Sequence, residues 1–374
     1  MSGRVAIRSA QKLVLTLFTF ITWCGLHSQP AQAASEASPT QTSPAAGAPA
    51  RVPFIVGLTT LRAVSTPDGD YETLRTIESI DASGYCIVVS GEVSADDGGE
   101  PVSVKVRRRI STADQASAPR MRNYFHEDDD ESFPGTVPGF SAATVKQLKT
   151  SGKAQMTYLE VQPFFGQTMV VRELSGVLTR ANMGTLPVLV NGRMVDLPII
   201  HAKGILADGE DKEPFDYVVL DDPANPIVLR AEGDGTSTAI VRIEYPEPNA
   251  ALTSIENSLA KREIAKVYGI YFSFNLAVLR PESDRVLKEI GSIMKAHPDW
   301  KLRVDGHTDG IGNDKANTDL SRRRADAVKA ALVSRYGIDA RRLTTAGYGK
   351  SAPQDTNDTP EGRARNRRVE LRRE

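Results

Sequence analysis

Between residues 53 and 248 the chain shows short runs rich in β-branched residues, separated by Gly, Asp, Asn and Pro. Runs of this kind predict antiparallel hairpins. The clearest turn is Asn191-Gly192, between LPVLV and RMVDLPI, because Asn and Gly accept the positive φ values of a tight two-residue turn. The same pattern predicts two further hairpins, in which YCIVVSGEV pairs with VSVKVRRRI and NPIVLRAE pairs with TAIVRIEY.

One face of these strands is expected to be buried. Val102, Val104 and Val106 alternate with polar residues, and this two-residue period places the three valines on one face. The pattern therefore predicts an all-β domain over residues 53–248, arranged as a sandwich or a partly open barrel.

The pattern changes after residue 248. Leu252, Ile255, Leu259 and Ile264 recur at roughly helical spacing, which predicts a short amphipathic connecting helix within residues 249–265.

Residues 266–374 are typical of an α/β domain. Helical segments are predicted for PESDRVLKEIGSIMKAH, for residues 314–336 and for TPEGRARN, and strands for VYGIYFSF, WKLRVDGH, IDARRLTTAGYG and RRVELRRE. Mixed segments of this spacing predict a small mixed sheet with helices packed on one face.

The first 33 residues differ from the rest. Three basic residues and no acid precede an uncharged apolar run from Leu13 to Leu26, and small residues follow at Ala31 and Ala33. This order predicts a secretory signal peptide over residues 1–33, cleaved before Ala34. The alternative is a retained membrane anchor, although the run is shorter than the ~20 residues that a spanning helix needs. Residues 34–52, rich in Ala, Ser, Thr and Pro, predict a semi-extended linker.

Cleavage would leave Cys86 as the single cysteine, so no intramolecular disulfide is expected. Charge is distributed unevenly along the mature chain. Residues 34–260 carry 19 basic and 31 acidic side chains, whereas residues 261–374 carry 24 basic and 16 acidic ones. This asymmetry indicates an anionic partner for the C-terminal half, or attraction between the two halves.

The segment DGHTDGIGNDKANTDLSRRRA contains the candidate binding chemistry. Leu320, Arg324 and Val328 recur every four residues, so Arg324 lies on the stripe that should face the sheet and needs an anionic partner. Asp309 follows a strand in a turn that feeds the same helix, which can bring its carboxylate near Arg324. Together they suit a zwitterionic ligand, with Asp309 on its ammonium and Arg324 on its carboxylate. The alternative is an internal salt bridge without a ligand.

From about residue 252 to 374 the chain resembles the OmpA-like peptidoglycan-binding domain family, a module of outer-membrane protein A, peptidoglycan-associated lipoprotein and MotB-type proteins. The resemblance rests on GIYFSFNLAVLRPES, the GHTDGIG turn, the LSRRRA helix, AGYGKSAPQDTN and the terminal EGRARNRRVEL. It implies a noncovalent module that binds the diaminopimelate of peptidoglycan stem peptides, with Asp309 on the amino group and Arg324 on the carboxylate.

The resemblance also implies lesser roles for other positions. Those near the ligand are Asn317, Thr308, Gly310 and Ile311. The family's N-R-R signature is matched by Asn366, Arg367 and Arg368. Arg368 is a candidate ligand contact. The alternative role of these three residues is to order the last strand and the loop before it. The first strand reads Tyr-Phe-Ser-Phe, with Ser273 where the family often has an acid, and this difference could alter contacts to the peptide.

Neither a metal nor catalysis is indicated. HEDDDES, residues 126–132, is acidic, but its spacing matches no EF-hand loop and favours a solvated charge run. The four mature histidines lack metal-ligand spacing, and His307, which could pass for a catalytic base, is better placed in a turn or core role. Cys86 lies in an apolar strand and is expected to be an inert thiol. No cofactor and no nucleic acid partner are expected.

These patterns favour a noncatalytic periplasmic protein that docks on peptidoglycan, with a β-rich domain that engages an outer-membrane or periplasmic protein. Two alternatives remain. One is a subunit of an envelope machine, a stator or a secretion anchor, which would keep its N-terminal membrane helix. The other is a cell-wall enzyme whose active site lies in the β-rich domain.

Overall fold

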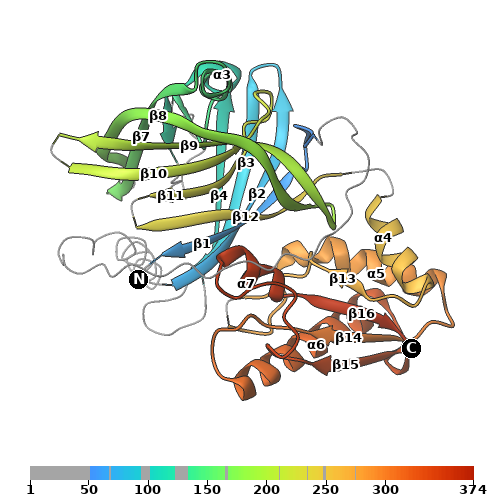
Figure 1. Ribbon diagram of the computed structural model, residues 1–374. Helices are drawn as coiled ribbons and strands as arrows, with labels where there is room; N and C mark the ends of the chain where they lie inside the picture. Colours follow the sequence, from blue (N-terminus) through green and yellow to red (C-terminus); the bar gives the residue numbers. More distant parts are fainter. Residues whose placement is uncertain are drawn as a thin grey trace, which may run out of the picture.

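The structure is a computed structural model with an N-terminal β-rich part and a C-terminal α/β part (Figure 1). The predicted signal segment, most of the linker, the acidic run 126–132 and the side chains of Val102 and Val104 lie outside the described residues. The structure describes residues 51–66, 69–93, 102–122, 134–164, 167–209, 211–233, 235–246, 250–273 and 275–374.

The described strands of the β-rich part belong to one twelve-stranded sheet rather than to the two separate sheets of a sandwich. Their order is β4-β3-β2-β1-β12-β11-β10-β9-β8-β7-β5-β6. The strands are β1 (Thr59–Thr66), β2 (Gly69–Asp81), β3 (Gly84–Val93), β4 (Val102–Ser111), β5 (Arg120–Arg122), β6 (Thr136–Val137), β7 (Lys153–Phe164), β8 (Gln167–Val190), β9 (Arg193–Asp208), β10 (Asp211–Leu220), β11 (Val228–Gly233) and β12 (Thr236–Glu244).

The three predicted hairpins are confirmed as the antiparallel pairs β3–β4, β8–β9 and β11–β12. In the β8–β9 turn, Asn191 and Gly192 both have positive φ, 45° and 77°, as a tight two-residue turn requires. The C-terminal end of β8 also pairs in parallel with β12, through Leu189 and Val190. Because β8 and β12 are also linked through β9, β10 and β11, this part of the sheet bends until its first and last strands meet.

The buried face of β4 is only partly apolar. Val106 and Ile110 are buried as their alternation predicts, but Arg108 lies between them on the same face and is also buried. Its guanidinium donates to the hydroxyl of Thr136 on β6. The alternation therefore predicts the direction of each side chain correctly but not the burial of a charged group.

Among the described residues, two helices interrupt the region for which only strands were expected: α2 (Thr112–Ser117) and α3 (Ala142–Ser151). Helix α3 begins at Ser141, whose hydroxyl accepts from the Thr144 amide, and ends at Gly152 with a left-handed φ of 73°. Its Val145 and Leu148 are fully buried against the sheet. The capping residues were visible in the sequence, so this helix is a missed prediction.

The C-terminal part has a four-stranded mixed sheet in the order β13-β16-β14-β15, with β14 parallel to β15 and β16 antiparallel to both of its neighbours. Its elements are α4 (Ala250–Ala260), β13 (Ala265–Val267), the 3₁₀ turn η1 (Pro281–Ser283), α5 (Asp284–Ala296), β14 (Leu302–Gly306), α6 (Asp314–Tyr336), the 3₁₀ turn η2 (Ala340–Arg342), β15 (Leu343–Gly347), α7 (Pro360–Asn366) and β16 (Val369–Arg373).

The predicted first strand is shorter than expected. β13 ends at Val267, and beyond it only an isolated bridge joins Phe272 to Leu279. The backbone of Tyr271 bonds instead to the segment before α5: its amide donates to the Ser283 hydroxyl (2.8 Å), and its carbonyl accepts from the Arg280 amide (3.0 Å). These bonds satisfy the backbone polar groups without a neighbouring strand.

The two faces of the small sheet differ in chemistry. Leu302 and Val304 of β14 are buried in one core with residues of α4, α5 and α6, whereas Arg303 and Asp305 point to the opposite, polar face. Leu259 of α4 belongs to this core, so the connecting helix is packed into the α/β part. Within the described ranges, no helix combines the length and the apolar character needed to cross a bilayer.

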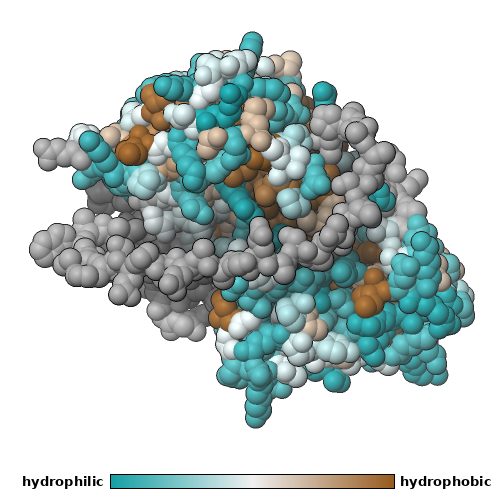
Figure 2. All heavy atoms as spheres, viewed as in Figure 1, coloured by the Kyte–Doolittle hydropathy of each residue, from teal (hydrophilic) through white to brown (hydrophobic). Residues whose placement is uncertain are grey.

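The two parts are in contact. Helix α7 packs against β12 and β1 of the large sheet (Figure 1). Around this junction the surface of the C-terminal part is mostly hydrophilic in the view of Figure 2. A small apolar cluster lies between the parts, made of Leu61, Ala63, Leu74, Val241, Tyr271 and Ala364.

Candidate ligand-binding site

The GHTDGIG turn leaves the carboxyl end of β14 and leads into α6, so it lies where the two parallel strands end. Its backbone is held from two sides. The His307 amide donates to the Arg368 carbonyl (3.0 Å), and the Thr308 amide donates to the Gly349 carbonyl (2.9 Å). The turn is thereby fixed between the loop after β15 and the start of β16, and Asp309 stands at its tip.

Asp309 is mostly buried, with 13% of its side chain exposed. Its Oδ1 accepts from the Ile311 amide (3.0 Å), and its Oδ2 accepts from Arg367 Nη1 (2.5 Å). The carboxylate therefore has one neutral and one charged donor. Its charged partner is Arg367 rather than the predicted Arg324.

Arg324 reaches the same region from α6 and is only 8% exposed. Its Nε donates to the Leu276 carbonyl (3.0 Å), and its guanidinium carbon lies 5.1 Å from the centre of the Phe272 ring. Burial and the neighbouring positive charge of Arg367 lower its pKa to about 10, although the carboxylates of Glu72 and Asp309 oppose this effect. Asp309 and Arg324 are thus close enough to interact electrostatically, but they form no direct ion pair.

Arg367 joins the turn to the β-rich part. Its Nη1 donates to Asp309, while its Nε (3.0 Å) and Nη2 both donate to Oε1 of Glu72 on β2. Burial works against its charge, yet the Glu72 and Asp309 carboxylates outweigh burial and raise its pKa. Arg367 was identified in the N-R-R signature but was not predicted as a site residue, and nothing in the sequence pattern pointed to Glu72.

The other predicted positions mainly build the turn. Asn317 is buried on α6 and donates to the Ile311 carbonyl (2.8 Å). The Thr308 hydroxyl donates to the carbonyl of Asp309 (3.0 Å), and the Gly310 amide donates to the Asn357 side chain (2.7 Å). Ile311 differs from them, because its side chain is 60% exposed beside the site.

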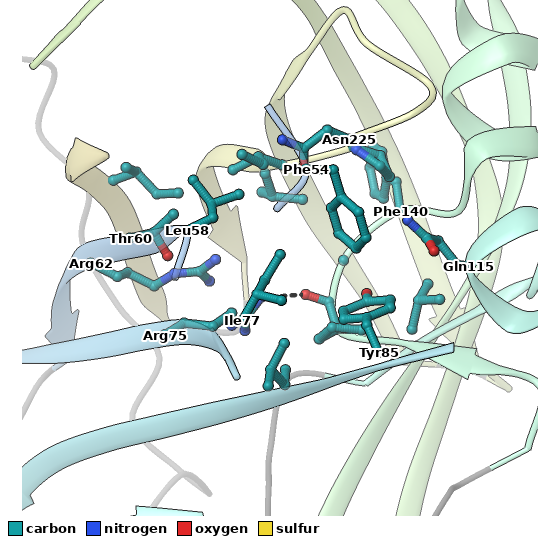
Figure 3. Close-up of a pocket in the computed structure, with 18 residues that line it drawn as sticks. Phe54, Leu58, Thr60, Arg62, Arg75, Ile77, Tyr85, Gln115, Phe140 and Asn225 are labelled. Carbon is teal, nitrogen blue, oxygen red and sulfur yellow. Dashed lines mark hydrogen bonds between the residues drawn. The ribbon is translucent and has the colours of Figure 1, made fainter. Parts of the chain in front are cut away.

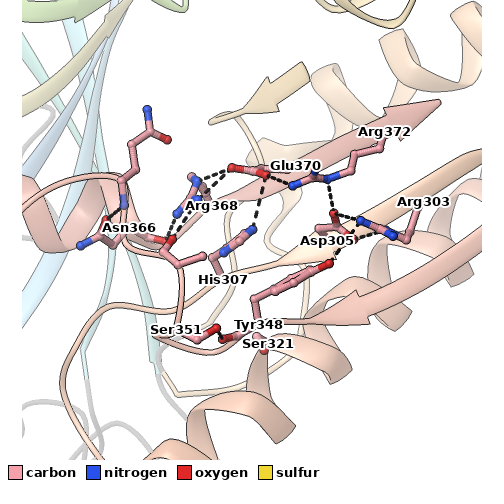
Figure 4. Close-up of polar contacts among 12 residues, drawn as sticks. Arg303, Asp305, His307, Ser321, Tyr348, Ser351, Asn366, Arg368, Glu370 and Arg372 are labelled. Atoms are coloured by element: carbon pink, nitrogen blue, oxygen red, sulfur yellow. Dashed lines mark hydrogen bonds and ion pairs between the residues drawn. The ribbon is translucent and has the colours of Figure 1, made fainter. Parts of the chain in front are cut away.

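Arg368 points toward Glu370 on the polar side of the small sheet (Figure 4). Its Nε (2.9 Å) and Nη2 (2.8 Å) both donate to Glu370 Oε1, and Nη2 also donates to the Ala352 carbonyl (3.1 Å). Neighbouring Asn366 accepts from the amides of Gln354 and Asp355. These contacts favour the ordering role for Arg368 and Asn366 over ligand contact.

His307 belongs to the same polar network (Figure 4). Its Nε2 lies 3.6 Å from Glu370 Oε2, and its ring stacks on Tyr348 with the centroids 5.2 Å apart. His307 and Arg368 lower the pKa of Glu370 to about 2. Because His307 is 3% exposed and packs between Glu370 and Tyr348, it has the surroundings of a core residue.

The OmpA family model matches residues 271–367, the segment that contains the turn, the α6 arginine and Arg367. The C-terminal domain is an OmpA-family domain.

Curated relatives share part of this sequence. Outer membrane porin F of Pseudomonas aeruginosa is 35% identical over 151 residues, which cover 40% of this chain and 43% of that protein. Peptidoglycan-binding protein ArfA of Mycobacterium bovis is 37% identical over 124 residues, covering 33% of this chain and 36% of that protein. The matched region therefore spans less than half of either relative. The crystal structure of the peptidoglycan-associated lipoprotein from Burkholderia pseudomallei is 25% identical over 33% of this chain and 99% of that chain, with a TM-score of 0.28.

A second candidate site is a cavity of about 80 Å³ inside the β-rich part (Figure 3). Phe54, Ile77 and Tyr85 line it, and the side chains of Arg62 and Arg75 lie at one side. Arg75 donates to the Pro138 carbonyl (3.0 Å). This volume holds no more than a few water molecules, so the cavity does not fit an organic ligand or a peptide.

Among the described residues, no cluster of three or more His, Cys, Asp or Glu side chains has the geometry of a metal site. Cys86 is half-buried rather than fully buried, and it accepts a weak hydrogen bond from Arg109 Nη1 at 3.6 Å. By the chemistry of their side chains, the charged groups around the GHTDGIG turn of the OmpA-family domain are the leading candidate for ligand binding.

Proposed function

We propose that this protein is a noncatalytic periplasmic component of the cell envelope that binds peptidoglycan through the diaminopimelate of stem peptides. The OmpA-family domain binds the wall and thereby attaches the β-rich part to it. The names of its relatives, which include an outer membrane porin and a peptidoglycan-binding protein, support an envelope location and a wall ligand.

The observation that carries the proposal is the placement of two opposite charges on separate rigid elements. Asp309 stands on a turn held by β15 and β16, and Arg324 stands on α6, so their separation is set by packing rather than by their own side chains. Because the two do not pair with each other, a ligand that brings one ammonium and one carboxylate can engage both.

Diaminopimelate has this chemistry. The free end of its side chain bears an ammonium and a carboxylate on the same carbon atom. The ammonium would be accepted by Asp309 and the carboxylate held by the Arg324 guanidinium, while the Phe272 ring under Arg324 keeps that side chain extended. Lysine, which replaces diaminopimelate in other walls, lacks this carboxylate and would lose the Arg324 contact.

The test is co-sedimentation of the mature chain with purified sacculi that contain diaminopimelate. The native protein is expected to pellet with the sacculi, and Asp309→Ala and Arg324→Ala are expected to stay in the supernatant while keeping the native circular dichroism spectrum. Matched controls are Asp319→Ala and Arg323→Ala, two exposed positions on the same helix, which should pellet like the native protein.

Two comparisons sharpen the result. Sacculi with lysine in place of diaminopimelate should bind at least about tenfold more weakly, because a lost charge-assisted contact costs about 1.5–3 kcal/mol. Equal binding to both wall types would refute recognition through the ligand carboxylate. Release of soluble muropeptides during the incubation would instead support the enzyme alternative and contradict the noncatalytic assignment.

A further inference from the structure

We propose that the β-rich part closes the ligand site of the OmpA-family domain, with Glu72 on β2 acting as an internal substitute for the ligand's carboxylate. Binding to the wall then requires Glu72 to withdraw from Arg367. This inference rests on the proposed function, because it concerns the same Asp309 and Arg324 site.

The contact between Glu72 and Arg367 resembles ligand recognition in its chemistry. Two nitrogens of the Arg367 guanidinium donate to one Glu72 oxygen, while its third nitrogen donates to Asp309. The Glu72 carboxylate, 295 positions from Arg367 in the same chain, thus binds the arginine that also contacts Asp309. The Glu72 carboxylate also opposes the lowering of the Arg324 pKa, so its charge acts on both guanidiniums.

The charges at the site balance only when Glu72 is included. Counted by formal charge, the site contains two arginines, Arg324 and Arg367, and two carboxylates, Asp309 and Glu72. Without Glu72 the group has an excess positive charge in a largely buried place, which is costly unless an anion replaces it. An arriving carboxylate would supply that charge and could be held by Arg324 and Arg367 together, which leaves Asp309 for the ammonium.

The neighbouring strand reinforces the closure. On β3, Glu92 accepts from the Ser273 hydroxyl (2.9 Å) and lies 3.9 Å from Arg280, while Ser90 donates to Glu282 (2.9 Å). Ser273 adjoins Phe272, the residue whose ring lies under Arg324, so β3 is attached to the segment that carries this ring. Ser273, the position where this chain departs from the family pattern, is therefore used to hold the β-rich part.

The closure explains why the site is so little exposed. Asp309 and Arg324 are mostly shielded from solvent, and the apolar cluster between the two parts includes Leu74, two positions from Glu72, and Tyr271, next to Phe272. Ligand binding and docking of β2 are then mutually exclusive at Arg367, so each must weaken the other by the same factor. A partner that pulls β2 away would strengthen attachment to the wall.

The test compares Glu72→Gln with the native mature chain. The probe is the tripeptide L-Ala-γ-D-Glu-meso-diaminopimelate, and its dissociation constant is measured by isothermal titration calorimetry. Glutamine keeps the shape of the side chain but removes its charge, so the tripeptide should bind about tenfold more tightly, the scale of one charge-assisted hydrogen bond. The matched control is Glu78→Gln on the same strand. Glu78 forms an exposed ion pair with Arg107, and loss of this ion pair should leave the affinity for the tripeptide unchanged.

A second measurement uses the native protein and does not depend on a variant. Hydrogen exchange of the β2 amides around Glu72 should accelerate when saturating tripeptide is added, because the ligand displaces this strand from Arg367. Amides of β7, whose sheet neighbours are β8 and β5, should not change.

The outcomes separate the two ideas. Native affinity in Glu72→Gln, with binding still lost in Asp309→Ala, would overturn the closure and leave the proposed function intact. Weaker binding in Glu72→Gln would also overturn it, because Glu72 would then belong to the ligand site. Failure of the native chain, of Glu72→Gln and of Glu78→Gln to bind would refute the proposed function and the closure with it.

Discussion

Replacing Glu370 by Gln should destabilise the OmpA-family domain by about 3 kcal/mol. Glu370 is 4% exposed, and its pKa is lowered from 4.5 to about 2 by His307 and Arg368. At about 1.4 kcal/mol for each tenfold change in proton affinity, that difference corresponds to about 3 kcal/mol of folded-state stabilisation. Glutamine would remove the charge and turn an amide donor toward the Arg368 donors.

The assay is urea unfolding followed by the fluorescence of Trp300. The whole sequence contains two tryptophans, Trp23 and Trp300, so a chain that starts at Ala34 reports only on the buried Trp300 of the OmpA-family domain. With a denaturant dependence of about 2 kcal/mol per molar urea, the midpoint should fall by about 1.5 M in Glu370→Gln. The control Asp299→Asn removes an exposed contact to Arg373 and should shift the midpoint by less than about 0.3 M.

The pH dependence provides a second check with a definite sign. Because the Glu370 pKa is lower in the folded than in the unfolded chain, its stabilisation is fully present above about pH 4.5 and is lost as pH falls through about 2. The difference in unfolding free energy between native protein and Glu370→Gln should therefore be constant near neutral pH and shrink below pH 4.5. A midpoint that does not move at pH 7, or a difference that grows on acidification, would refute the reasoning.

Three further predictions concern other parts of the chain. Gly306→Ala should destabilise the OmpA-family domain by about 1–3 kcal/mol in the same Trp300 assay, because a Cβ atom there would lie 2.1 Å from the Ser321 carbonyl oxygen of α6. Asn191→Val should lower the melting temperature of the β-rich part, since it forces a β-branched residue to φ 45° and removes the acceptor of the Tyr245 amide; an unchanged melting curve would contradict this. Mass spectrometry of protein recovered from the periplasm should give Ala34 as its first residue, whereas an intact N-terminus would support the anchored alternative.

The uneven charge of the two halves has a structural counterpart at the junction. Three acidic residues of the β-rich part, Glu72, Glu92 and Glu244, lie within ion-pair distance of arginines of the C-terminal part. The charge asymmetry therefore contributes to attraction between the two halves of the chain. In another ion pair the charges are exchanged, because Arg230 of β11 in the β-rich part pairs with Glu361 of α7 in the C-terminal part (2.7 Å).

The sequence by itself determined the features that depend on short-range order. The hairpin at Asn191-Gly192 follows from the backbone preferences of two residues, and helix α6 with Arg324 on its inner stripe follows from helical periodicity. The turn containing Asp309 could be identified as a candidate site from its motif alone. Helix α3 could have been found in the same way, from Ser141 and Gly152, because capping is also a local property.

Tertiary structure decided which charges meet. Arg367 and Arg368 are adjacent in sequence, yet one turns to Asp309 and Glu72 while the other pairs with Glu370 on the opposite side of the chain. Periodicity shows that neighbouring side chains diverge, but it cannot show which carboxylates lie in each of the two directions. The partners of Arg367 depend on how β2 docks on the OmpA-family domain. This contact joins residues 295 positions apart. Its energy comes from packing and from electrostatics between distant parts of the sequence rather than from any local pattern.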